Sequence, residues 1–188
     1  LGAITMTAST GGTSTLVVKG AAKVDGVGVL KANAYDFSGM TADFIMGTTA
    51  LISNYAASSS NSTIITGGSG NDEIVGDADN LQEINGGAGN DTINGGSKAD
   101  TINGGAGNDI IGGDSKVAVG TSTGKDVVDG GAGKDTITLG GTALVTITGG
   151  DGDDNIKVAA NLTYGQSIKG GAGTDILEVS DQSTVTLA

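Results

Sequence analysis

A six-residue segment of the form Gly-Gly-x-Gly-x-Asp recurs through the second part of this 188-residue chain, and it restricts the fold more than any other feature. One large aliphatic residue stands two positions after the aspartate of each copy. Six copies share this frame: residues 67–72, 86–91, 104–109, 130–135, 149–154 and 170–175. So regular a frame predicts a repeat array.

The aliphatic residues keep a beat of about nine residues. The six intact copies lead to Ile74, Ile93, Ile111, Ile137, Ile156 and Leu177, and weaker copies between them lead to Ile84, Ile102, Val128, Ile147 and Ile168. Successive spacings in the merged order are 10, 9, 9, 9, 17, 9, 10, 9, 12 and 9 residues. This pattern predicts very short strands, each with one inward aliphatic, joined by glycine turns and interrupted by a few loop insertions.

Charge and composition indicate a cation as the partner. The chain carries 21 acidic and 9 basic residues, for a net charge of −12, which argues against nucleic acid or an anionic membrane. It contains no cysteine and no histidine, so disulfides, thiolate sites and imidazole ligands are excluded. Fifteen of the 18 aspartates follow residue 66, and carboxylates together with turn carbonyls are the ligands that calcium prefers.

The nonapeptide GGxGxDxUx, with U a large aliphatic, resembles the RTX (repeats-in-toxin) calcium-binding repeat over residues 67–179. The resemblance implies an all-β fold, a parallel β-roll or β-solenoid in which two nonapeptides make each turn and calcium lies between stacked GGxGxD loops. Residues 1–65 are rich in Thr, Ala and Ser, and short alternating runs at 15–19 and 27–32 predict strands. We therefore expect a β-solenoid-like segment over 1–65 and an RTX β-roll over 66–188.

Two nonapeptides per turn would place all six intact loops on one edge of the roll. We expect about five calcium ions in the five gaps of that edge, and the weaker loops of the other edge predict one or two more, for five to seven ions in all. The alternative is that insertions shift the phase and distribute the ions equally over both edges. The expected metal positions on the first edge are Gly68, Gly70, Asp72, Gly87, Gly89, Asp91, Gly105, Gly107, Asp109, Gly131, Gly133, Asp135, Gly150, Gly152, Asp154, Gly171, Gly173 and Asp175, and those on the second are Asp77, Asp79, Asp100 and Asp126.

Without the ion, the repeat region is expected to be unfolded or nearly so. Its interior would hold one aliphatic residue per nonapeptide. Stacked loops would also bring aspartates about 5 Å apart, where like charges repel by roughly 3 kcal/mol at an effective dielectric constant of 20. A divalent cation makes this electrostatic interaction attractive, so metal binding would supply the folding free energy.

Several motifs that point to other functions are weaker. Residues 120–124, GTSTG, match the nucleophile pattern G-x-S-x-G, but the chain has no histidine to serve as the partner base. Residues 151–155 begin like an EF-hand, yet Ile156 stands where that loop requires glycine. Solvated turn formation explains single aspartates but not six in one frame. We therefore predict no enzymatic activity and no catalytic residue.

The resemblance also implies a secreted, bacterial cell-surface protein exported by a type I pathway, of which this chain would be a piece. A surface-layer (S-layer) protein is the favoured parent, because residues 1–65 look like its β-solenoid segments. A calcium-stiffened adhesin and the C-terminal domain of a secreted protease, lipase or toxin remain alternatives. The expected partners are calcium, copies of the chain in a lattice and, through regions outside this segment, cell-surface polysaccharide; nucleic acid and membrane insertion are not expected, since no run of about 18 apolar residues occurs.

Overall fold

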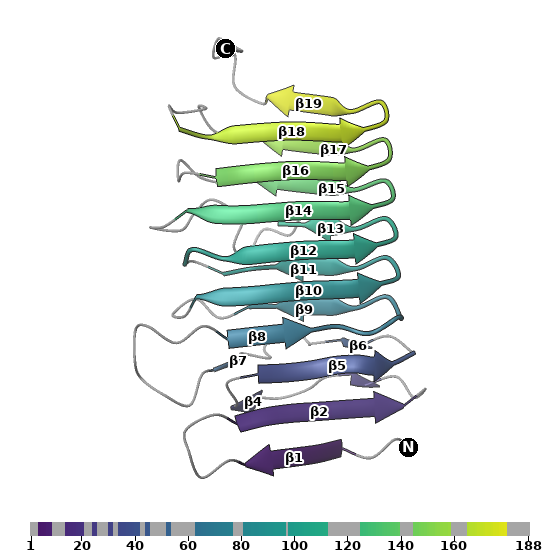
Figure 1. Cartoon of the computed structure of the whole chain (residues 1–188), viewed down its shortest axis with the longest axis vertical. Helices are drawn as coiled ribbons and strands as arrows, with labels where there is room; N and C mark the ends of the chain where they lie inside the picture. The colour runs from purple at the N-terminus through teal and green to yellow at the C-terminus, as the bar shows by residue number, and fades with distance from the viewer. Residues whose placement is uncertain are drawn as a thin grey trace.

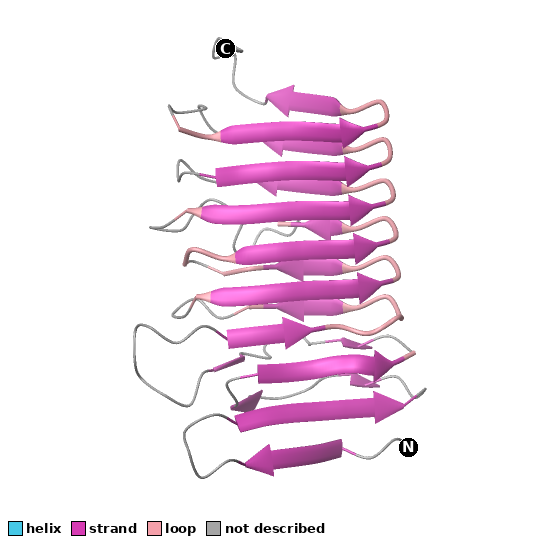
Figure 2. Cartoon of the chain, in the orientation of Figure 1, coloured by secondary structure: helices cyan, strands magenta, loops and turns pink. Residues whose placement is uncertain are grey.

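The chain winds into an all-β solenoid whose two main sheets face each other (Figures 1 and 2). The computed structural model describes residues 4–8, 14–20, 24–25, 30–31, 34–41, 44–45, 52–53, 63–76, 81–96, 98–112, 125–139, 145–158 and 165–179, and these contain nineteen strands and no helix. Every strand pairing between these residues is parallel except that of β1 with β2. The prediction of a parallel β-roll is confirmed.

From β2 onward, each coil contributes one strand to each of the two main sheets, and β1 adds a ninth strand to the first. The first sheet runs in the order β1 (Ile4–Ala8), β2 (Ser14–Gly20), β5 (Ala34–Met40), β8 (Thr63–Thr66), β10 (Gln82–Ala88), β12 (Thr101–Ala106), β14 (Asp126–Ala132), β16 (Val145–Asp151) and β18 (Ser167–Ala172). The second runs in the order β3 (Val24–Asp25), β6 (Phe44–Ile45), β9 (Glu73–Val75), β11 (Thr92–Asn94), β13 (Ile110–Ile111), β15 (Thr136–Leu139), β17 (Asn155–Val158) and β19 (Ile176–Val179). A separate pair joins β4 (Leu30–Lys31) and β7 (Ile52–Ser53).

Two columns of aliphatic side chains, one from each sheet, form most of the core, and Phe37, Leu139, Val145 and Val158 are buried beside them. Strand register aligns Ile65, Ile84, Ile102, Val128, Ile147 and Ile168 in the first sheet, and Ile74, Ile93, Ile111, Ile137, Ile156 and Leu177 in the second. All of them except Ile65 are residues that the nine-residue beat predicts as inward. All are buried except Ile168, which is partly buried, and Leu177, which is 38% exposed at the last coil.

The first sheet is continuous from the N-terminal segment into the repeats. Strand β5 pairs with β8, and β8 pairs with β10, in parallel register. The division of the chain at residues 65 and 66 into two units stays a prediction.

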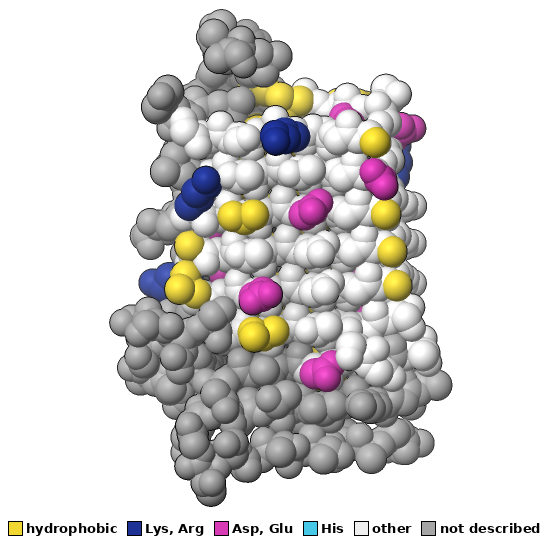
Figure 3. Space-filling model, viewed as in Figure 1, with side chains coloured by type: hydrophobic (Ala, Val, Ile, Leu, Met, Phe, Trp, Pro, Cys, Tyr) yellow, Lys and Arg dark blue, Asp and Glu magenta, His cyan; other side chains and the backbone are white. Residues whose placement is uncertain are grey.

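The outward face of the first sheet is flat and mixed in character. Hydrophobic, acidic and basic side chains are interspersed over it among small polar groups (Figure 3). Ile64 and Val127 are the large apolar residues exposed there in the described part of the sheet. No helix in the described residues is long and apolar enough to cross a membrane.

Candidate metal centre

The six Gly-Gly-x-Gly-x-Asp loops stack on one edge of the solenoid. Each connects a strand of the first sheet to the following strand of the second, beginning with β8 to β9 and ending with β18 to β19. Parallel register keeps equivalent loop residues in line from coil to coil, so that Gly87, Gly105, Gly131, Gly150 and Gly171 form one column. The predicted positions of this edge are therefore brought together in a single row.

The loop aspartates form a ladder of hydrogen bonds through the interior of that edge. The backbone N–H of each aspartate donates to Oδ1 of the aspartate one coil later: Asp72 to Asp91 at 2.8 Å, Asp91 to Asp109 at 2.8 Å, Asp109 to Asp135 at 2.8 Å, Asp135 to Asp154 at 2.9 Å and Asp154 to Asp175 at 3.1 Å. All but Asp175 are at most 2% exposed. One oxygen of each carboxylate from Asp91 to Asp175 is thus used by the fold itself.

The second carboxylate oxygen has no hydrogen-bond partner at four successive positions. Oδ2 of Asp91, Asp109, Asp135 and Asp154 is buried and receives no donor. A Cβ added to Gly86 would lie close to Asp91 Oδ2 and to the carbonyl oxygen of Gly104 on the next coil, and the loops of Asp109, Asp135 and Asp154 repeat this arrangement. A carboxylate oxygen and a carbonyl oxygen therefore lie close together, and the buried carboxylate oxygen has no donor, which is costly in the absence of a cation.

The glycines permit this close stacking. The second and third glycines of the loop have positive φ in all five loops after the first, as at Gly105 (114°) and Gly107 (128°). A Cβ on Gly107 would also collide with the carbonyl oxygen of Gly89 on the preceding coil. Other side chains rarely adopt such a backbone, so the repeat needs glycine at these places.

We expect Gly107→Ala to weaken calcium-dependent folding, because a side chain at positive φ costs about 1–3 kcal/mol and the collision with Gly89 adds to it. The measurement is the calcium midpoint of folding followed by circular dichroism. Ala106→Ser, at the exposed neighbouring position, should leave that midpoint unchanged. Equal midpoints for both variants would contradict the assigned backbone.

Burial disfavours the ionised form of these carboxylates in the absence of metal. Desolvation raises the pKa of Asp91 to about 7, with further increases from the charges of Asp72 and Asp109. It raises the pKa of Asp135 to about 6, and it also raises those of Asp109 and Asp154. A row of aspartates that cannot easily ionise beside one another suits neutralisation by protons or by a metal ion.

Acid should therefore partly replace the metal. An aspartate whose folded pKa is raised above its unfolded value of 3.8 stabilises the fold at low pH and loses that contribution as pH rises through the folded value. We expect the metal-free chain to gain β-structure when pH falls from about 8 to about 5. Circular dichroism and small-angle scattering in metal-free buffer test this, and an unchanged unfolded signal at about pH 5 would refute it.

The opposite edge holds a shorter acidic pair. Asp100 and Asp126 are buried in neighbouring coils, and the N–H of Asp100 donates to Asp126 Oδ1 at 3.0 Å. Desolvation, followed by the charge of Asp126, raises the pKa of Asp100 to about 8. Strand register places Gln82 before this pair and Val145 after it, so the carboxylate column of this edge has only two members among the described residues. Asp77 and Asp79 lie outside the described residues.

The donor set is one carboxylate per loop together with backbone carbonyls. Among the described residues no three acidic, histidine or cysteine side chains converge on a single point. Any bound ion must therefore take loop carbonyl oxygens in addition to aspartates. An all-oxygen site of this kind suits calcium, which accepts six to eight oxygen ligands in flexible geometry.

A second ladder, on the outer side of the same loops, was not anticipated. The N–H of Asn90 donates to Asn71 Oδ1 at 2.7 Å, that of Asn108 to Asn90 Oδ1 at 2.8 Å, and that of Lys134 to Asn108 Oδ1 at 2.7 Å. These bonds run from a later coil to an earlier one, opposite to those of the aspartates. Asparagine at the fifth place of the first three loops was the available signal in the sequence.

Comparison with known proteins gives one match. Residues 59–80, 85–115 and 121–143 match the family described as RTX calcium-binding nonapeptide repeat (4 copies). These segments cover the first four of the six loops. No curated protein and no solved structure matches the chain.

Proposed function

From the premise that the repeat region of this chain belongs to the RTX calcium-binding nonapeptide repeat family, we propose that it is a structural, non-catalytic segment that folds on calcium outside the cell. The ions lie along the edge of the six intact loops. Their ligands are the six loop aspartates and the carbonyl oxygens of the glycine turns. Calcium supplies positive charge to this row; the chain supplies the positions of the oxygen atoms and excludes water.

One observation carries this proposal. Oδ2 of Asp91, Asp109, Asp135 and Asp154 is buried beside a glycine carbonyl and accepts no hydrogen bond. Four buried anionic atoms without donors, spaced one per coil, would destabilise a fold that bound nothing. The same atoms stabilise the folded chain when a divalent ion is coordinated by each of them.

We propose five ions on this edge, one for each gap between consecutive loops, and one or two at Asp100 and Asp126, with Asp77 and Asp79 as further candidates. Calcium-soaked crystals with anomalous scattering would count the ions on each edge. A row of ions on the first edge with at most two on the second supports the one-sided arrangement. Equal numbers on both edges would contradict it.

The parent protein is proposed to be part of a crystalline bacterial surface layer exported unfolded by a type I pathway. Continuity of the first sheet from β5 through β8 into the repeats supports a stiff rod suited to a lattice. RTX repeats are typical of secreted proteins, and millimolar extracellular calcium would fold this region after export. Copies of the chain would be lattice partners, and surface polysaccharide would be bound by other regions.

Electron microscopy of the purified protein with and without calcium tests the lattice. Calcium-dependent two-dimensional arrays support the surface-layer function. Folded but unassembled rods would favour an adhesin segment instead. A catalytic domain elsewhere in the full-length protein would favour the secreted-enzyme alternative.

A further inference from the structure

The row of aspartates has a first loop that differs from the others. Gly68 and Gly70 lack the positive φ found at the equivalent glycines of the next five loops. In addition, Asp72 Oδ2 accepts the N–H of Gly68, within its own loop, at 2.8 Å, whereas Oδ2 of Asp91 has no donor. Loop 67–72 therefore has a different conformation from the five loops above it.

Beneath this loop lies a large side chain where the repeats have glycine. Strand register pairs Tyr35 with Ile65 and Asp36 with Thr66, which brings Phe37 beside Gly67, the first glycine of the loop. In the second sheet, β6 pairs Ile45 with Glu73, so that Phe44 rather than an aspartate stands opposite Asp72. The coil before the first loop thus has Phe37 in the glycine column and no aspartate opposite Asp72.

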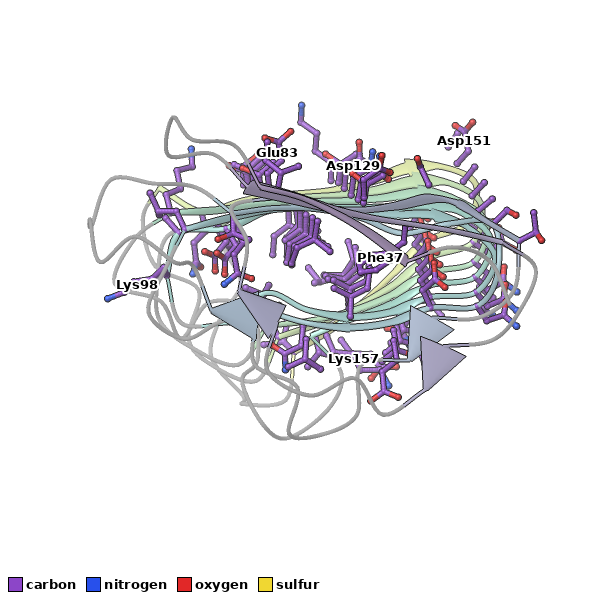
Figure 4. All side chains as sticks on the ribbon, turned by 90° about the horizontal axis from the view of Figure 1, so that it is seen from below. Phe37, Glu83, Lys98, Asp129, Asp151 and Lys157 are labelled. Carbon is purple, nitrogen blue, oxygen red and sulfur yellow. The ribbon has the colours of Figure 1, made fainter. Side chains whose placement is uncertain are left out.

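The position of Phe37 directs its side chain toward the carboxylate row. A Cβ at the first glycine faces the aspartate of its own loop and the following coil: at Gly67 it would lie 2.7 Å from Asp72 Oδ2. Phe37 is 1% exposed and lies inside the coil, on the side where the carboxylates stack (Figure 4). Its backbone is held by Asp36, whose Oδ1 accepts the N–H of Ser38 at 3.0 Å and the Ser38 hydroxyl.

We infer that Phe37 closes the first end of the ion row. Its ring fills the interior below loop 67–72, so that the first ion lies between this loop and loop 86–91 and no ion lies below Asp72. The ring also keeps water from reaching the first ion through the end of the row. This inference rests on the proposed calcium function and assigns Phe37 as a positioning residue rather than a ligand.

Terbium binding tests whether residue 37 lies next to the first ion. Terbium replaces calcium and emits light when an excited tryptophan lies close to it. The chain contains no tryptophan, so Phe37→Trp and the control Ile64→Trp each introduce a single one, the second on the exposed outer face. We expect strong sensitised emission from Phe37→Trp and little from Ile64→Trp. Equal emission, or none from a Phe37→Trp chain that binds terbium and folds, would overturn the inference.

Smaller side chains at position 37 test whether Phe37 keeps water from the first ion, and they avoid the overpacking that tryptophan could cause in the core. Phe37→Ala should weaken one ion about tenfold and add inner-sphere water to it, measured from terbium lifetimes in light and heavy water. Phe37→Leu should keep the parent values. The control is Ile65→Ala, which truncates a buried side chain on the neighbouring strand β8. It should lower thermal stability without changing the number of water molecules bound to terbium. Equal changes in that number for Phe37→Ala and Ile65→Ala would refute the inference that Phe37 excludes water. If the parent chain bound neither calcium nor terbium, the proposed function itself would fail.

Discussion

Calcium removed with a chelator is expected to unfold residues 67–179, leaving far-ultraviolet circular dichroism of an unfolded chain near neutral pH. The reason lies in the aspartate ladder. Five of its carboxylates, from Asp72 to Asp154, are buried one per coil, and four of them carry an oxygen with no donor. In the absence of metal, their mutual repulsion and desolvation oppose the burial of only one or two aliphatic side chains per strand.

Calcium titrated back in the millimolar range should restore β-structure cooperatively. Each added ion neutralises the carboxylates on both sides of its gap, so stacking of one coil favours binding at the next. Magnesium at the same concentration is the control and should fold the chain poorly, because it demands near-octahedral geometry and gives up its water reluctantly. A chain equally structured and equally heat-resistant in excess chelator would refute the calcium-folding mechanism.

Asp109→Asn is expected to raise the calcium midpoint of folding by at least about tenfold, since ligand charge sets calcium affinity. An amide retains an oxygen that can accept the N–H of Asp91, bonded at 2.8 Å in the parent, but it removes the charge next to two gaps of the row. Isothermal calorimetry should show two weakened ions. The midpoint itself is read from circular dichroism.

Two further variants separate this effect from general loss of charge. Asp175→Asn removes a carboxylate that borders one gap between the six loops, so it should weaken one ion and shift the midpoint less. Glu83→Gln removes a charge on the exposed outer face, where Figure 4 shows the side chain pointing away from the interior, and should leave the midpoint unchanged. If Glu83→Gln shifted the midpoint as far as Asp109→Asn, the ladder would not be the site of binding.

Much of the fold could be predicted from the repeat frame. The beat of nine residues identified the inward aliphatics, and the resemblance to RTX repeats added two nonapeptides per coil. Together they placed all six intact loops on one edge and separated Asp100 and Asp126 onto the other. This worked because a solenoid converts sequence period directly into spatial position: equivalent residues of successive coils must lie in register.

The roles of the individual oxygen atoms could not be predicted. Each aspartate from Asp91 onward accepts at Oδ1 the N–H of an aspartate on the preceding coil. At Asp91, Asp109, Asp135 and Asp154 this leaves Oδ2 for a ligand. The outer asparagine ladder likewise depends on donors from another coil. Such bonds join residues 18 to 26 positions apart, and their direction follows from how the coils stack rather than from the local motif.

The period, the inward aliphatics, the glycine turns and the edge on which the carboxylates gather all follow from the amino-acid sequence, because each recurs with the repeat. The residue that lies beneath the first loop follows from strand pairing instead. Phe37 belongs to no repeat, and it lies beneath Gly67 only because β5 pairs with β8 across a long connection. A contact between a repeat and a non-repeating segment leaves no periodic signal, so its position follows from strand pairing alone.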